Sequence, residues 1–201
     1  MALELTTVQR VKDVLGAGGT TLGSDLDTFI DRLIKQYSVR FEQEMGRTAE
    51  AAEYTQTFDL EHGVHLVSLP AYPVSEIVSV KNDPNNVFDG DAIDPLLYYL
   101  DAPKGLLFLK FDTYCGPGTL QVVWVGGMSD DGATDPTASF IENYPDIAAA
   151  MDQQVAEAVR RKDRMGASNT SFEGGGNTYE GAFKLLPEVA RTLALHRRMF
   201  S

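Results

Sequence analysis

The chain has few cysteines and few histidines. It contains one cysteine, Cys115, and three histidines among 201 residues. A single cysteine cannot form an internal disulfide, and a nucleophilic role for it needs a histidine close in space, which sequence alone does not show. His62 and His65 flank an expected turn and His196 lies far along the chain, so no zinc ligand set is evident.

Long hydrophobic runs are also missing. No stretch approaches the roughly 20 apolar residues of a membrane-spanning helix. The first residues, MALELTTVQRVKDVLG, are charged and periodic, which is not the pattern of a signal peptide. We therefore expect a soluble protein made in a cytoplasm, with no membrane partner.

Positive charge is scarce and unevenly distributed. The chain has 17 Lys and Arg against 29 Asp and Glu, a net charge of −12. Residues 1–150 hold 9 cations and 23 carboxylates (−14), whereas residues 151–201 hold 8 and 6 (+2). Because nucleic-acid binding requires a basic face that displaces counterions, this balance disfavours tight DNA binding. It is compatible with a surface that DNA slides past, since acidic groups repel phosphate.

Motifs of known cofactor and catalytic sites are absent. The glycine clusters GAGGTTLG and EGGGNTYEG lack the Gly-Lys-Ser/Thr ending of a phosphate-binding loop. The turn DGDAID, with Asp89, Asp91 and Asp94, lacks the distal glutamate of an EF-hand loop and indicates an exposed acidic turn. The run RRKDR at residues 160–164 contains an aspartate and is typical of a solvated helix end. We expect no catalytic residue, no metal and no cofactor.

Helical periodicity marks both ends of the chain. Thr7 is expected to cap a short helix that stops at Gly16, and a longer helix should run from Ser24 to a C-terminal cap at Gly46. The apolar residues of the longer helix recur at three- and four-residue spacings: Leu26, Phe29, Ile30, Leu33, Ile34, Tyr37, Phe41 and Met45. Two further helices are expected, one from Pro145 and one from Pro187 to the chain end.

Residues 53–125 have a different character. Six short runs are rich in β-branched and aromatic residues and are separated by turn sequences: EYTQTFDL, VHLVSL, SEIVSVKN, LLYYL, GLLFLKF and TLQVVWV. Trp124 is expected in the core of this region. Gly126 and Gly127 should permit a sharp exit after the last strand. Residues 129–143 read as an acidic loop and residues 166–180 as a flexible glycine-rich linker.

The predicted fold class is therefore α+β. A helical bundle formed by the N- and C-terminal helices (residues 1–52 and 128–201) carries an inserted small antiparallel β-sheet or barrel (residues 53–127).

The order of these parts resembles the head–tail connector, or adaptor, family of tailed bacteriophages. The matching pieces are Gly46-Arg47 after the long helix, the segment with Leu69, Pro70, Pro73 and Val74, the step Trp124, Gly126 and Gly127, and Pro145 before the alanine-rich Ala148–Ala150. The resemblance spans roughly residues 5–200. The long acidic loop and the glycine-rich stretch before the last helix depart from the family pattern.

The resemblance implies a structural virion protein and not an enzyme. Copies in that family form a twelve-fold ring under the portal of the capsid, extend the DNA channel and give a docking platform for the tail or the next neck protein. The implied partners are the portal protein, further copies of the chain, a tail or stopper protein, and genomic DNA that passes without sequence-specific binding. The implied location is the virion neck, and the host cytoplasm during assembly.

Two sets of residues are candidates for contacts with partners. Apolar side chains flanked by arginines suit insertion into a groove, which favours a portal-binding segment made of Leu193, His196, Arg197, Arg198, Met199 and Phe200. The helix from Pro145 is built of small residues, which favours an inter-subunit face made of Ile147, Met151, Val155, Arg160 and Arg161.

Three alternatives remain open at this point. The last helix could fold back on its own bundle. The protein could be a stopper or tail-completion protein, one layer further down the neck. From a different class, it could be a small hydrolase or ligand-binding module that uses the sheet and Cys115.

Overall fold

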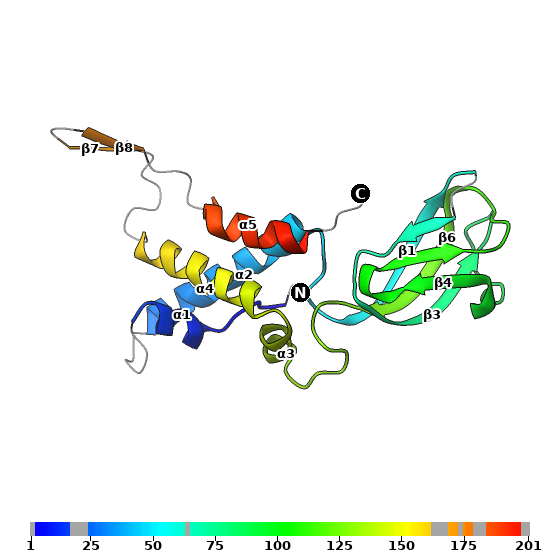
Figure 1. The fold of residues 1–201 in the computed structure, drawn as a ribbon, viewed down its shortest axis with the longest axis horizontal. Coiled ribbons are helices and arrows are strands. Elements are labelled where there is room, and N and C mark those ends of the chain that lie inside the picture. The colour runs from blue at the N-terminus through cyan, green and yellow to red at the C-terminus, as the bar shows by residue number, and fades with distance from the viewer. Residues whose placement is uncertain are drawn as a thin grey trace. The chain divides into compact units, whose positions relative to one another are not determined.

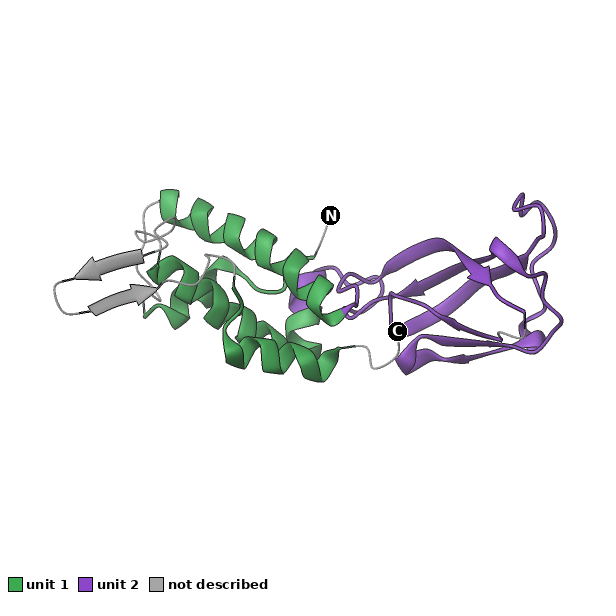
Figure 2. Cartoon of the chain, turned by 90° about the horizontal axis from the view of Figure 1, so that it is seen from above, with its two compact units in different colours: residues 1–45, 140–201 green, residues 46–139 purple. Residues whose placement is uncertain are grey.

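The structure, a computed structural model, describes residues 3–16, 24–62, 65–161, 169–172, 175–178 and 184–197. The chain divides into two compact units (Figure 2): unit 1 comprises residues 1–45 and 140–201, and unit 2 comprises residues 46–139. Residues 46–52 and 128–139 thus belong with the strands, although the sequence pattern assigns them to the helical part. These two segments are hydrogen-bonded to each other. The N–H groups of Met128 and Ser129 both donate to the Ala49 carbonyl, at 3.0 and 2.9 Å.

Unit 1 is helical. Its helices are α1 (Val8–Val14), α2 (Ser24–Met45), α4 (Pro145–Arg160) and α5 (Pro187–His196), and α3 (Pro136–Asn143) crosses the boundary between the units. The helix α4 contacts α1, α2 and α5, and α5 also contacts α2 (Figure 1). The helix α4 therefore packs against both the N-terminal helix α1 and the C-terminal helix α5.

The helix ends follow the expected capping chemistry. The Thr7 side chain accepts a hydrogen bond from the Arg10 N–H and begins α1. Gly46 follows the end of α2 with φ +63°, a left-handed conformation that glycine adopts without steric cost. Pro145 and Pro187 occupy the first turns of α4 and α5, where a missing N–H leaves no hydrogen bond unmade.

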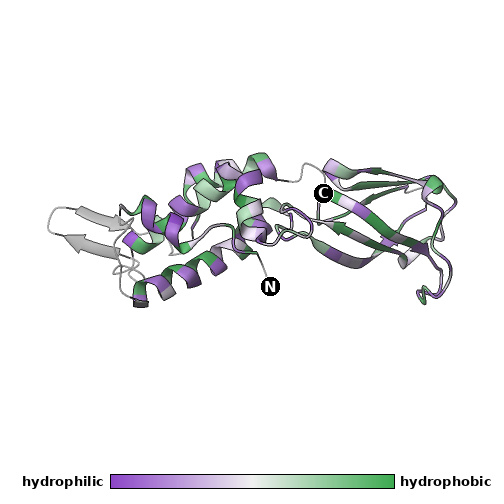
Figure 3. Ribbon diagram, turned by 90° about the horizontal axis from the view of Figure 1, so that it is seen from below, coloured by the Kyte–Doolittle hydropathy of each residue, from purple (hydrophilic) through white to green (hydrophobic). Residues whose placement is uncertain are grey.

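The core of unit 1 is built from one apolar stripe on each helix. Figure 3 shows hydrophobic and hydrophilic residues on the same helices, which is the pattern of amphipathic helices packed around a core. The largest side chains with at most 3% exposure are Leu5, Val11, Ile30, Leu33, Ile34, Tyr37, Phe41, Met45, Phe140, Ile147, Met151, Val155, Val189 and Leu193. Six of the eight stripe residues expected on α2 are in this set, and Leu26 and Phe29 are only partly buried.

Unit 2 contains two three-stranded antiparallel sheets. The first has the order β1–β6–β3 and the second the order β2–β5–β4. The strands are β1 (Ala52–Leu60), β2 (Leu66–Ser68), β3 (Val74–Asn82), β4 (Tyr98–Asp101), β5 (Leu106–Leu109) and β6 (Gly116–Gly126). All six predicted runs thus form strands, and the expected α+β fold class is confirmed.

The two sheets share one hydrophobic core. Val67, Leu107 and Leu109 of the second sheet join Leu120 and Val122 of the first in a single cluster of buried residues. Trp124 belongs to this cluster and is 1% exposed, and the ring centroids of Tyr54 and Phe58 lie 5.7 and 6.3 Å from its own. The prediction that Trp124 anchors the core of the β region is confirmed.

The last strand ends on two glycines for two different reasons. A Cβ on Gly126 would lie 2.5 Å from the Ala71 carbonyl oxygen, so the close approach of the backbone excludes a side chain. Gly127 has φ +150°, and a Cβ there would lie 2.6 Å from Ala51 Cα. The chain leaves the sheet where only glycine fits.

Two segments differ from the expectations. The acidic loop at residues 129–143 contains the helix α3, whose first turn is capped by Asp135 through the Ala138 N–H at 3.0 Å. The glycine-rich segment, expected as a linker, contains a two-stranded hairpin of β7 (Asn169–Phe172) and β8 (Gly175–Thr178).

We predict that Gly127→Ala destabilises unit 2 by about 3 kcal/mol or more, because the variant combines a strained φ with overlap against backbone atoms. Urea unfolding monitored by the fluorescence of Trp124, the only tryptophan, measures the change. Gly90→Ala is the matched control, since a Cβ there meets nothing within 4 Å. Equal stability of the two variants would contradict the assigned role of Gly127.

Candidate partner-binding surface

The C-terminal helix α5 is fixed to unit 1 by its apolar side. Val189 and Leu193 are 1% and 2% exposed, one helical turn apart, and α5 contacts α4 and α2. The structure therefore has this helix folded on its own bundle. Leu193, expected at a partner interface, belongs to the core, because it shares the helix face of Val189.

A buried glutamine on α4 fixes the beginning of α5. The Gln154 side-chain oxygen accepts a hydrogen bond from the Leu186 N–H at 2.8 Å, and its side-chain nitrogen donates to the Lys184 carbonyl at 3.3 Å. Gln154 is 3% exposed, so these contacts satisfy buried polar atoms of its side chain, which also hydrogen-bonds Tyr37. The amide side chain thus sets where the last helix starts.

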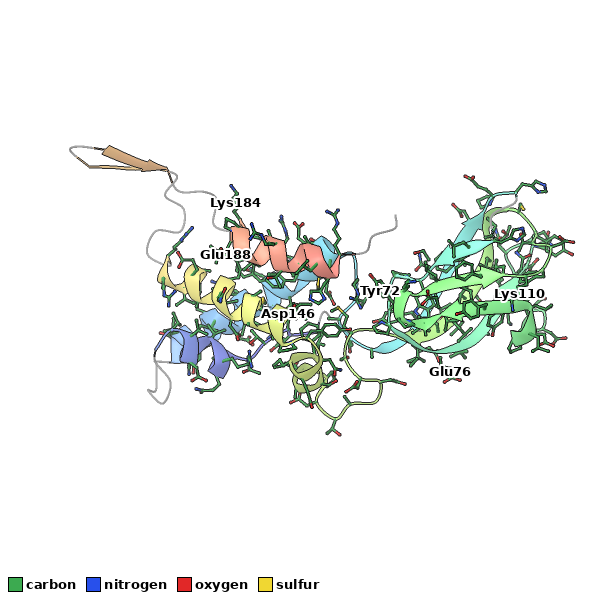
Figure 4. The ribbon with its side chains drawn as sticks, in the orientation of Figure 1. Tyr72, Glu76, Lys110, Asp146, Lys184 and Glu188 are labelled. Atoms are coloured by element: carbon green, nitrogen blue, oxygen red, sulfur yellow. The ribbon has the colours of Figure 1, made fainter. Side chains whose placement is uncertain are left out.

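A surface pair fixes the other end of α5. His196 Nε2 lies 2.6 Å from a carboxylate oxygen of Asp146, the residue after the first proline of α4 (Figure 4). The His196 ring also meets the Tyr144 ring edge-on at 5.8 Å. Burial acts to raise the pKa of Asp146, but the hydrogen bond and charge of His196 and the Ile147 N–H outweigh it and lower that pKa.

The outward side of α5 combines apolar and cationic side chains. Leu195 is 80% exposed, and Arg191, one turn earlier, and Arg197 are exposed as well. This face has the chemistry that the sequence pattern assigned to Leu193, but on the opposite side of the helix. Of the other expected portal-binding residues, His196 is partly exposed, and Arg198, Met199 and Phe200 lie outside the described residues.

The face of α4 expected between subunits is mostly internal. Ile147, Met151 and Val155 are fully buried within unit 1, where they support the chain's own bundle. Their fully buried side chains offer no surface to a neighbouring chain, and this part of the expectation is corrected. Arg160 and Arg161 lie at the exposed end of the helix and form ion pairs with Glu157 at 3.8 and 2.7 Å. These two arginines remain candidates for an inter-subunit contact.

A second buried polar residue on α4 holds the N-terminal segment. Asp152, 4% exposed, accepts hydrogen bonds from Arg10 at 3.1 and 2.8 Å and from the Thr6 hydroxyl. The sequence offers one signal for this residue, which is its helical position between the apolar Met151 and Val155. A charged residue on a buried helix face requires a partner, and here Arg10 supplies it.

Negative charge is concentrated in unit 2. Unit 2 carries 14 carboxylates and 4 cations (−10), and unit 1 carries 15 and 13 (−2). Asp89, Asp91 and Asp94 are exposed, as expected for an acidic turn. The preceding Asp83 organises the loop, because N–H groups of Asn85, Phe88 and Val87 donate to its carboxylate and lower its pKa.

Cys115 and His62 lie close together at the surface of unit 2. Cys115 is exposed, and its sulfur lies 3.9 Å from His62 Nδ1, a distance at the outer limit of a sulfur hydrogen bond. In the described part of the chain no further side chain hydrogen-bonds His62, so the pair lacks the orienting third group of an activated nucleophile. The same residues contain no cluster of His, Cys, Asp or Glu suited to a metal ion, and no helix long and apolar enough to cross a membrane.

Comparison with known proteins gives structural similarity without sequence similarity. No protein-family model and no curated protein sequence matches the chain. A chain in the virion of a native gene transfer agent particle superposes with a TM-score of 0.61 at 13% identity, covering 100% of this chain and 94% of that chain. A chain from the neck of an empty gene transfer agent particle, computed with C6 symmetry, gives 0.60 at 12% identity, covering 96% and 90%.

A third similar chain comes from the neck of a native gene transfer agent particle computed with C12 symmetry. It gives a TM-score of 0.52 at 14% identity, covering 100% of this chain and 97% of that chain. At identities this low, the TM-scores establish a shared fold and nothing beyond it. The coverage extends that shared fold over both units.

We predict that Gln154→Ala loosens α5, because it leaves the part-buried Leu186 N–H without its side-chain acceptor, at a cost of about 1 kcal/mol. Hydrogen exchange of the α5 amides should accelerate, while that of unit 2 stays unchanged. Gln153→Ala is the matched control, since Gln153 is the exposed neighbour on the same helix. Unchanged α5 exchange in Gln154→Ala would contradict the role of Gln154 in fixing the beginning of α5.

The pair of Asp146 and His196 predicts a pH dependence. A carboxyl whose folded pKa lies below its ordinary value of 3.8 stabilises the fold above that value, and this stability is lost as the pH falls through the folded pKa. Because the Asp146 side chain is 50% exposed, the effect should stay below about 1 kcal/mol. Helix unfolding followed by circular dichroism should show Asp146→Asn less stable than the native chain at pH 5, with the difference vanishing in stronger acid. His196→Ala should remove this pH dependence of stability. If the pH dependence persists in His196→Ala, His196 is not its cause.

Proposed function

We propose that the protein is a structural component of a virion neck, a head–tail connector that assembles as a ring under the portal of a tailed-phage-type particle. The observation that carries the proposal is the whole-length fold similarity, at a TM-score of 0.61, to a chain of a gene transfer agent virion. Two further similar chains come from gene transfer agent necks. The order of motifs in the sequence, which resembles phage connectors, supports the same location independently.

The proposed ring contains twelve copies. The symmetry of one similar neck, C12, supports this number, and the C6 symmetry of the other is a subgroup of it. In a ring each subunit contacts its neighbours through two different surfaces, and rotation closes the circle. Modest contacts therefore suffice, because each one is repeated around the ring.

The charge distribution suits a passage for DNA. Unit 2, at −10, repels phosphate groups, so DNA that moves past it is not held by the counterion release that drives non-specific binding. The proposed ring thus extends the DNA channel without sequence-specific contacts. During assembly the chain is in the host cytoplasm, and in the finished particle it is in the neck, where it also gives a platform for the tail or the next neck protein.

The proposed portal contact is the outer face of α5. Leu195 is an exposed apolar side chain, Arg191 lies one turn before it on the same face, and the exposed Arg197 follows the end of the helix. An apolar anchor inside a charged rim is the usual composition of a binding hot spot. Val189 and Leu193 hold the helix in place from the other side, so the face is presented by a fixed element.

Point variants test this contact better than truncation. Deleting α5 would remove Val189 and Leu193 from the core, so a loss of binding could reflect unfolding. We predict that Leu195→Asp lowers affinity for the portal protein of the same virion by about tenfold or more, a loss typical of a hot-spot residue. Pull-down measures affinity, and electron microscopy of the mixture asks whether a coaxial ring forms. Val39→Asp on α2, also an exposed apolar position, is the matched control.

The outcomes separate the proposal from its alternatives. A coaxial ring on the portal that is lost in Leu195→Asp supports both the connector role and the α5 contact. A ring that survives this substitution overturns the α5 contact alone. Binding to a connector-loaded portal but not to the bare portal indicates a stopper protein, one layer further down the neck.

A further inference from the structure

Three of the four edge strands in unit 2 are short, irregular or covered. In the second sheet the edge strands β2 and β4 have three and four residues. In the first sheet the register of β3 against β6 shifts before Glu76 and again before Ser79. The Ile93 N–H also donates to the Val80 carbonyl at 2.8 Å, so a loop of the same unit covers part of the β3 edge. Short, bulged and covered edges are protected against pairing with other chains.

The remaining edge strand, β1, has none of these protections. It pairs with β6 residue for residue over positions 52–58, and it contains no lysine and no proline. In the described part of the chain β6 is its only strand neighbour. Residues 55–57 are all exposed. Gln56 is on the same side of the strand as Tyr54 and Phe58, which pack against the core, so the core side of the sheet is uncovered at this edge.

Unit 1 contains two strands that have no larger sheet to belong to. Within the described ranges, β7 and β8 pair only with each other. A two-stranded hairpin alone is at best marginally stable in water. Joining an existing sheet gives hydrogen-bond partners to one of its edges. Of the two strands, β7 suits this pairing better, because it contains a β-branched threonine and no glycine, whereas β8 begins with two glycines.

The length of the chain favours a second copy as the source of the hairpin. Unit 2 leads into the beginning of α4 through α3, and the hairpin follows the end of α4, 16 residues or roughly 24 Å further along. Residues 161–168 and 179–186 connect the hairpin to α4 and α5. Each connection spans at most roughly 27 Å. Both would be stretched fully just to bring the hairpin back to the beginning of α4, at a cost in chain entropy.

We propose that β7 of one copy pairs with the open edge of β1 in a second copy, so that the strand order becomes β8–β7–β1–β6–β3. Main-chain hydrogen bonds hold such an added strand. The contact is heterologous, since it joins the hairpin of one chain to the sheet of the next, and it is therefore of the type that closes a ring. It rests on the proposed ring assembly and identifies the segments that form it.

Cross-linking between two differently tagged full-length chains tests the pairing. Both chains carry Cys115→Ser, which removes the exposed native thiol. One carries a single cysteine at one of the residues 55–57, and the other carries a single cysteine at Thr170 or Ser171 of β7. Each combination is treated with a short bismaleimide, at high concentration and in complex with portal.

Strand pairing predicts an alternating pattern, because neighbouring residues of a strand face opposite sides of the sheet. One β7 position should react with Thr55→Cys and Thr57→Cys, and the other with Gln56→Cys, each about tenfold faster than the remaining combinations. Val78→Cys, an exposed position on the β3 edge, is the matched control and should show no such pattern.

Amide hydrogen exchange gives a second test that needs no cysteine. In rings of the native chain, the β1 amides that face away from β6 should exchange about tenfold more slowly than in the free chain. A chain in which glycine and serine replace all of residues 169–178 should lose this protection. Urea unfolding followed by Trp124 fluorescence should be the same for both free chains, because the replaced residues belong to unit 1. Exchange of the β3 amides is the internal control.

Other patterns would overturn the contact. Cross-links without the alternation show proximity without strand pairing, and cross-links from the β7 positions to portal show that another protein binds the hairpin. An internal cross-link in a dilute chain that carries both cysteines shows pairing within one copy.

The same experiments separate this contact from the connector role. Rings seen by electron microscopy without the alternating cross-links show that copies associate through other segments, so the connector role stands while this contact fails. If no ring forms on portal, the connector role fails, and the cross-links at high concentration still decide whether the two strands pair.

Discussion

The architecture depends on how the segment at residues 69–74 is held against the end of β6. Trp124 donates its indole N–H to the Ala71 carbonyl at 2.9 Å, and the Gly127 N–H donates to the Pro73 carbonyl at 3.0 Å. Arg47 donates to the Tyr72 carbonyl at 3.0 Å and covers the Tyr72 ring at 4.1 Å. These contacts join three motifs that lie up to 80 residues apart in sequence. They fix the point where the chain enters and leaves the β unit, so a long insertion between helices stays compatible with one helical core.

In the helical unit, two buried polar residues of one helix fix the positions of segments from both ends of the chain. Asp152 binds the N-terminal segment through Arg10, and Gln154 binds the segment that leads into α5. Apolar packing alone permits sliding along a helix axis, whereas a hydrogen bond to a defined backbone group specifies one register. The helix α4 therefore orients both chain ends. This orientation decides which side of α5 faces solvent.

Much of this arrangement could be predicted from the sequence, and the failures have identifiable causes. The long apolar period of α2 and the six β-rich runs are strong local signals, and they correspond to the observed elements. The acidic composition of residues 129–143 favours a loop where the helix α3 forms, although Asp135 and Pro136 provide an N-terminal capping signal. The apolar chain end with its flanking arginines favours a partner interface that includes Leu193, but Leu193 lies in the core. Its spacing of four residues from Val189 indicates the buried face.

The uneven charge constrains how copies can associate. At physiological ionic strength charges are screened beyond about 8 Å, so the net charge of −10 on unit 2 matters less for a contact than the groups at its rim. A contact between two surfaces of like charge is strengthened by added salt, because the salt screens their repulsion. A contact between two surfaces of opposite charge is weakened by added salt, because the salt screens their attraction. The sign of the salt effect on self-association therefore distinguishes the two geometries, because apolar burial varies little over the same range of salt.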